Sequence, residues 1–106
     1  MADQPDETPI LDLLASMTAS SVEASSLDAE SLMLVRIAAL VAVDAPPASY
    51  LLNLAAAGDS GVDEDQVQGV LAAVAPIVGT ARVASAAGKM VRALDLKLGL
   101  GELESE

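Results

Sequence analysis

The segment LDAESLMLVRIAALVAVDAPPASYLLNLAAAG, residues 27–58, decides the fold of this chain. Its first half contains the run LMLVRIAALVAV, in which Arg36 is the one charged side chain, so the run is apolar nearly all round and predicts a buried helix. The pair Pro46–Pro47 ends that helix, because a residue before proline disfavours the helical conformation, and it begins the next one. Gly58 is a natural left-handed end for the second helix. We therefore expect two helices joined by a short corner.

One further helix precedes this segment. Thr8 followed by Pro9 is typical of a helix start, with a capping hydroxyl and then proline at the first helical position. We expect this helix to end near Ser16 or Met17. The polar run TASSVEASS, residues 18–26, is then a connector.

Two more helices follow the segment. Asp63 is expected to cap the first of them, and acids in its first turn suit the helix dipole. Pro76 and Gly79 interrupt that helix. The last helix is expected to run from about Thr80 to Leu98 and to end at Gly99.

The chain shows no alternation of apolar and polar residues with a period of two, which would indicate strands. We therefore predict an all-α domain of about five helices over residues 8–98. The acidic segments on either side are expected to be a disordered N-terminus, residues 1–7, and a flexible tail, residues 99–106.

The composition excludes several kinds of chemistry. The chain has no cysteine and no histidine, which removes thiolate nucleophiles, Cys and His metal ligands, and imidazole bases. We expect no metal and no cofactor. Asp63, Glu64 and Asp65 are interpreted as residues that favour a helix start rather than as a cation site. Carboxylates, hydroxyls, five Lys or Arg residues and one phenol, Tyr50, remain for catalysis or binding.

Charge and hydrophobicity restrict the partners. The net charge of −11, with only five scattered Lys and Arg residues, predicts that nucleic acid is repelled. The apolar runs at 37–43 and 70–81 are shorter than the ~20 residues that span a bilayer. The acidic N-terminus lacks the basic start of a signal peptide, so we expect a cytoplasmic protein. A hydrophobic content of 53% exceeds what a small domain can bury, which predicts a homo-oligomer.

The pieces LDAESLMLVRIAALVAV, YLLNLAAAG and DEDQVQGVLAAVAPIVGTARVASAAGKMVRAL occur in an order and spacing that resemble the carboxymuconolactone decarboxylase-like family. This family includes the alkylhydroperoxidase D (AhpD) proteins, and the resemblance covers residues 27–94. It implies a small helical domain built around an antiparallel helical hairpin, assembled as a trimer or hexamer. The loop DSGV is a few residues longer than is usual for the family.

The same resemblance locates the family's active-site positions. The peroxidase branch carries a Cys-x-x-Cys-x-x-x-His motif, which falls on Val43, Pro46 and Tyr50 here. A glutamate of the family falls on or beside Ser31, next to Glu30. A thiol hydroperoxidase needs one thiolate to attack the peroxide and a second thiol to resolve the product, and neither is present.

Tyr50, Arg36 and Ser31 remain as weak site candidates. In a functional interpretation, Tyr50 donates a hydrogen bond or a proton at the mouth of a pocket. In a structural interpretation, its ring fills the volume of the absent histidine and its hydroxyl is hydrogen-bonded. We favour the structural interpretation. Arg36 lies seven residues before Val43, on the same helix face, which directs it toward the family's site. Arg36 can bind the carboxylate of a ligand. Alternatively, it forms an ion pair within the protein or extends into solvent, and we favour this second interpretation. Ser31 is most simply an ordinary helix residue.

Three functions follow from these readings. We favour a non-catalytic helical oligomer that acts as a scaffold or holds a small ligand. The alternative is a cofactor-free lyase or isomerase that acts on a small organic acid through Arg36 and Tyr50. A hydroperoxidase is supported by family similarity only. Polar atoms around Tyr50 would favour the lyase, whereas Leu and Val side chains there would favour the scaffold.

Overall fold

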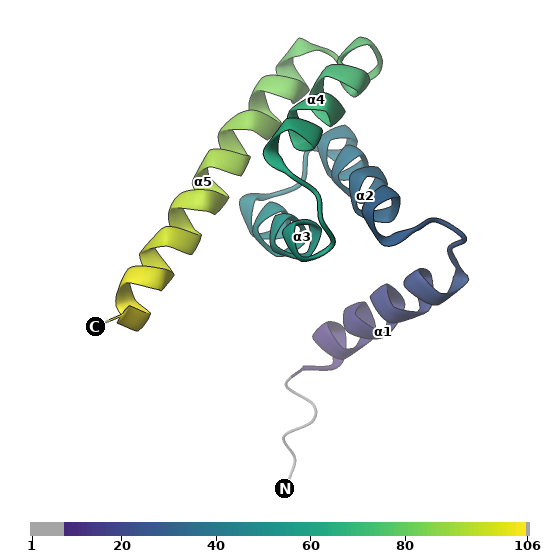
Figure 1. Ribbon diagram of the computed structural model, residues 1–106, viewed down its shortest axis with the longest axis vertical. Helices are drawn as coiled ribbons and strands as arrows, with labels where there is room; N and C mark the ends of the chain where they lie inside the picture. Colours follow the sequence, from purple (N-terminus) through teal and green to yellow (C-terminus); the bar gives the residue numbers. More distant parts are fainter. Residues whose placement is uncertain (1–7, 106) are drawn as a thin grey trace, which may run out of the picture.

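The computed structural model describes the backbone of residues 8–105 and the side chains of residues 8–95 (Figure 1). Within this part of the chain every regular element is a helix, which confirms the all-α class and the number of five helices. In chain order they are α1 (Pro9–Ala24), α2 (Ala29–Val43), α3 (Pro47–Asp59), α4 (Glu64–Val78) and α5 (Thr80–Ser105). The expected disordered N-terminus, residues 1–7, lies outside the described residues.

The two central helices begin and end close to where the sequence places them. The Asp28 carboxylate accepts a hydrogen bond of 2.7 Å from the backbone N–H of Ser31 and so caps α2. Asp44 ends α2 in the left-handed region, at φ 56°. Pro47 occupies the first turn of α3, as expected, because proline lacks the N–H that would be unpaired there.

Helix α1 is longer than the sequence indicates. It continues through the polar run to Ala24, so the expected end near Ser16 or Met17 is wrong. The Thr18 hydroxyl donates to the Leu14 carbonyl at 2.9 Å, which satisfies that side chain within the helix. Arg36 of α2 also donates to the Ser21 hydroxyl at 3.1 Å, so the polar half of α1 has a partner on the next helix.

The last two helices also extend beyond their predicted limits. Pro76 does not end α4, which continues to Val78 and stops at Gly79, whose φ of 92° favours glycine. Pro76 lies in the final turn of α4, so it removes the one hydrogen bond that its own position would donate to the Ala72 carbonyl, and only two helical residues follow it. Helix α5 passes through Gly99, its expected end, and continues to Ser105; a glycine inside a helix costs only about 1 kcal/mol relative to alanine.

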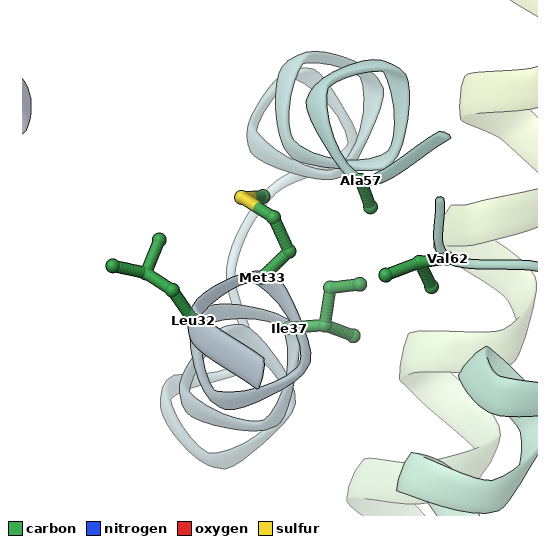
Figure 2. Close-up of a cluster of buried hydrophobic side chains, with 5 residues drawn as sticks. All are labelled: Leu32, Met33, Ile37, Ala57 and Val62. Carbon is green, nitrogen blue, oxygen red and sulfur yellow. The ribbon is translucent and has the colours of Figure 1, made fainter. Parts of the chain in front are cut away.

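The core consists of two clusters of buried side chains that share α2. The first cluster is shown in Figure 2, and its members are Leu32, Met33, Ile37, Ala57 and Val62. The second cluster contains Val41, Ala45, Tyr50, Ala86 and Ala93. Ile37 in the first cluster and Val41 in the second are completely buried. Helix α2 therefore passes through the centre of the bundle and contacts α3, α4 and α5.

Much apolar surface stays exposed in the single chain. Thirteen large hydrophobic side chains are exposed among the described residues, and six of them belong to α1. Helix α1 has no buried residue; it contacts α2 through the hydrogen bonds of Arg36, and its first half extends away from the other helices (Figure 1). Within residues 8–105, no helix combines the length and the apolar character needed to cross a membrane.

Candidate functional site

Tyr50 lies in the first half of α3 and is completely buried. Its ring belongs to the second cluster, in which its neighbours are aliphatic side chains from α2, α3, α4 and α5. The inward direction predicted for Tyr50 is therefore confirmed. Its hydroxyl has no hydrogen-bond partner among the described residues, so the expected hydrogen bond is absent. The reason is the surroundings, because Val, Ala and Leu side chains offer no acceptor and a Met thioether is only a weak one.

The phenol of Tyr50 is held in its neutral form. Burial raises the pKa of Tyr50 above its ordinary value of 10.0, and the negative charge of Asp44 raises it further. Tyr50 does not line either of the two hollows described below, which are a cleft beside Arg36 and an apolar groove. A buried phenol with a raised pKa is a poor proton donor.

The other two positions of the family's motif lie at the surface. Val43, at the end of α2, is 70% exposed, and Pro46 is exposed immediately before α3. The corner between α2 and α3 thus places Val43 and Pro46 in solvent and Tyr50 in the core. These three positions do not line a common cavity in the single chain.

Ser31 belongs to the start of α2. Its backbone N–H and its side chain both hydrogen-bond the Asp28 carboxylate, and the backbone bond is the main cause that lowers the pKa of Asp28 below its ordinary value. Neighbouring Glu30 accepts a hydrogen bond of 2.9 Å from Gln66 of α4. Ser31 precedes Val41 of the second cluster by ten residues, or about 15 Å of helix. Ser31 is therefore a capping residue distant from Tyr50.

Arg36 points toward α1. Its guanidinium donates to the Ser21 hydroxyl at 3.1 Å and to the Thr18 carbonyl at 3.5 Å. Together with Met17 and Asn53 these residues line a cleft of about 280 Å³ between α1, α2 and α3. The expectation that Arg36 faces the family's site is not met, because its hydrogen bonds direct it to α1. The three candidates thus lie in three separate surroundings.

A polar network that the sequence analysis missed joins the α2–α3 corner to α5. The Asp44 carboxylate forms an ion pair of 2.9 Å with Lys89 and accepts a hydrogen bond of 2.8 Å from the Ser85 hydroxyl. Arg82 donates to the Ala42 carbonyl. The hydrogen bond from Lys89 is the main cause that lowers the pKa of the Asp44 carboxyl below its ordinary value, and the bond from Ser85 adds to it.

The sequence does contain a signal for this network. Arg82, Ser85 and Lys89 are spaced three and four residues apart, so they share one face of α5 in a stretch otherwise made of Ala, Gly and Val. Their partner lies about 40 positions away, and no local pattern identifies it. The network attaches the corner to α5 and contains no nucleophile or acid–base pair aimed at a cavity.

An apolar groove of about 680 Å³ lies between α3, α4 and α5. Leu54 and Ala57 of α3 form one wall, and Met90 and Val91 of α5 form another. Asp63 lies at its rim, where it completes a capping box with Gln66 at 2.8 and 2.9 Å. The prediction of a capping role for Asp63 is confirmed.

Comparisons with known proteins add no family assignment. No family model matches the chain, and neither a curated protein nor a solved structure is significantly similar to it. Among the described residues, no three Asp or Glu side chains are grouped closely enough to hold a metal ion. The functional argument therefore depends on the geometry alone.

Replacement of Tyr50 by Phe is expected to stabilise the fold. The change removes a buried hydroxyl that has no partner, so the free energy of unfolding should rise by about 1 kcal/mol. Urea unfolding of both proteins at neutral pH measures it. Tyr50→Ala is the control for the ring and should lower the free energy by about 3–5 kcal/mol. A lower stability of Tyr50→Phe would contradict the absence of a partner.

The free energies of unfolding of the wild type and of Tyr50→Phe should diverge at alkaline pH. Above a pH of about 10, the unfolded chain ionises Tyr50 while the folded chain keeps it neutral, so the wild type loses stability as the pH rises. Tyr50→Phe lacks this loss. Unfolding curves of both proteins, recorded from neutral pH into this range, measure the difference. If the free energies of unfolding of the two proteins changed equally with pH, the result would contradict the raised pKa of Tyr50.

Asp44→Asn is expected to destabilise the fold at neutral pH and to have little effect in strong acid. Asparagine tolerates the left-handed conformation at this position, so the variant removes the charge without adding backbone strain. Because the folded-state pKa of Asp44 is lowered, its stabilising effect is present above its unfolded-state pKa and is lost as the pH falls through the folded-state value. Urea unfolding across this acid range measures the effect, and a pH-independent difference between the proteins would refute it.

Proposed function

We propose that the chain is a non-catalytic, cysteine-free member of the carboxymuconolactone decarboxylase-like family, which acts as a homo-oligomeric scaffold and small-ligand binder. The observation that carries this proposal is the complete burial of Tyr50 among aliphatic side chains. Tyr50 occupies the position that the resemblance gives to the family's histidine. A general acid or base must come within hydrogen-bond reach of the reacting group, and this phenol is covered by protein on all sides.

The exposed apolar surface supports the oligomer. Six large apolar side chains of α1 are at least half exposed, and others lie on α2, α3, α4 and α5. Large contiguous apolar patches on a protein surface are typical of interaction sites. Burial at an interface contributes roughly 25 cal/mol per Å² before the cost of association. The family resemblance favours a trimer or a hexamer, in which α2 and α3 would be the antiparallel hairpin.

The cleft at Arg36 supports a small organic acid as the ligand. Among the described residues no carboxylate forms an ion pair with Arg36, although the chain carries a net charge of −11. A guanidinium recognises a carboxylate through paired, charge-assisted hydrogen bonds. Asn53 and Ser21 add amide and hydroxyl groups to the cleft.

The lyase alternative is less well supported by this cleft. Decarboxylation or isomerisation of a bound acid needs a proton donor or acceptor beside it. The residues that line the cleft are Met17, Thr18, Ser21, Arg36 and Asn53, and none of them is a carboxylate or an imidazole that could exchange a proton with the acid. The cleft therefore favours binding without chemistry.

We expect the purified protein to sediment as a trimer or hexamer at micromolar concentration. Sedimentation equilibrium measures the mass.

We also expect the protein to show no peroxidase turnover. Incubation with an alkyl hydroperoxide and a dithiol measures turnover. The motif positions hold Val43, Pro46 and Tyr50, so no thiolate is available. A monomeric mass would overturn the oligomer, and turnover that scales with protein and survives a metal chelator would overturn the non-catalytic assignment.

Arg36→Lys is expected to weaken the binding of benzoate or succinate by about 10-fold or more, because lysine keeps the charge but loses the planar fork. Arg92→Lys, on the exposed side of α5, is the matched control and should leave the affinity unchanged. Isothermal titration calorimetry measures both. Equal affinities of the wild type and Arg36→Lys would remove the ligand part of the proposal and leave the scaffold.

A further inference from the structure

Two apolar surfaces of this chain lack a partner among the described residues. The first is the α1 face, formed by Ile10, Leu11, Leu13, Leu14 and Met17, each between 50% and 65% exposed. The spacing of three, four and seven residues places them on one broad side of the helix. The acids Asp12 and Glu23 lie on the opposite side.

Helix α1 needs a contact that the single chain does not provide. A helix of 16 residues is marginal by itself in water, and the second half of α1 is rich in Ser and Thr. Arg36 holds that second half through Thr18 and Ser21. The α1 face lies in the first half of the helix except for Met17, which also lines the cleft at Arg36, and none of its residues is buried.

The second surface is the apolar groove between α3, α4 and α5. Its walls are mostly apolar, and two of the residues along it, Val91 and Leu94, are more than half exposed. Its polar members, Asp63, Glu64 and Gln68, belong to the start of α4. An amphipathic helix that places residues three, four and seven apart into an apolar groove is a recurrent form of recognition.

We infer that the α1 face of one copy binds in the apolar groove of a second copy of this chain. This inference rests on the proposed homo-oligomer and names its interface. The acids of α1 lie opposite its apolar face, so they point away from the acidic start of α4 when the helix is docked. The contact thus avoids the like-charge repulsion that a net charge of −11 would otherwise impose.

The geometry of the single chain keeps α1 away from its own groove. In Figure 1, α1 and α5 lie on opposite sides of α3. Only residues 25–28 connect α1 to α2, and four residues span at most about 14 Å. The hydrogen bonds of Arg36 fix the end of α1 beside α2.

The area of this contact meets the requirement of a specific interface. At roughly 100 Å² of apolar surface per large side chain, the α1 face and the groove together offer about 700 Å² of exposed apolar area. If all of this apolar area is covered and about 60% of the contact is apolar, as in other interfaces, the contact would bury about 1,200 Å² in total. Specific interfaces begin at about this size.

The contact joins two different surfaces, so each copy donates one helix and accepts another. Such head-to-tail contacts close into rings when the rotation between copies allows it. A ring of three copies has three identical contacts and leaves no α1 face exposed. This arrangement agrees with the trimer that the family resemblance favours.

Two variants test the contact, one on each surface. Leu14→Asp places a charge at the centre of the α1 face, and Val91→Asp places one in the groove. Neither removes a buried side chain from the single chain, because Leu14 is 50% and Val91 is 59% exposed. Each variant alone is expected to sediment at the mass of one chain. Ser16→Asp on the polar side of α1 and Ala81→Asp on α5 outside the groove are matched controls and should sediment as the wild type does.

An equimolar mixture of the two variants gives the decisive result. The Leu14→Asp chain keeps an intact groove, and the Val91→Asp chain keeps an intact α1 face, so the mixture should form particles with the mass of two chains. If the wild type is oligomeric and either variant keeps the full mass, or the mixture stays monomeric, this interface is wrong while the proposed oligomer stands. If the wild type itself is a monomer, the proposed oligomer fails, and the inference fails with it.

Discussion

The burial of α2 is the constraint on which the rest of the structure depends. Its two completely buried side chains, Ile37 and Val41, lie in different clusters, so one helix organises both halves of the core. Helices α3, α4 and α5 all pack against it. With one aromatic residue in the chain, the core relies on many small aliphatic contacts rather than on large anchors. Such a core buries few large side chains, and a large share of the apolar residues remains at the surface.

The sequence predicts the elements that local chemistry specifies. The all-α class, the caps at Asp28 and Asp63 and the proline start of α3 all follow from patterns within a few residues. The inward position of Tyr50 was instead expected from the resemblance. The end of α1 does not follow from local patterns. The polar residues between Thr18 and Ala24 resemble a connector, and their helical state depends on Arg36 of the next helix.

The candidate site was less predictable because it depends on tertiary contacts. The sequence identifies Tyr50 and Arg36 as unusual residues, yet it does not show that one is enclosed by aliphatic groups and the other holds α1. The ion pair of Asp44 with Lys89 joins residues 45 positions apart, and the hydrogen bond to Ser85 likewise crosses between helices. Pairings of this kind carry no periodic signal. The sequence analysis did not predict this network, although the shared face of its α5 partners is a signal that the sequence contains.

Because Tyr50 carries the single aromatic ring of the chain, the protein is also well suited to optical spectroscopy. Every near-ultraviolet signal of the chain arises from one chromophore, which is packed in the second cluster. Near-ultraviolet dichroism therefore reports the packing of that cluster alone, while far-ultraviolet dichroism reports helix content. A state that keeps its helices but loosens its core would lose the first signal and retain the second. This natural separation of the two observables allows the order in which the core and the helices melt to be followed without any added label.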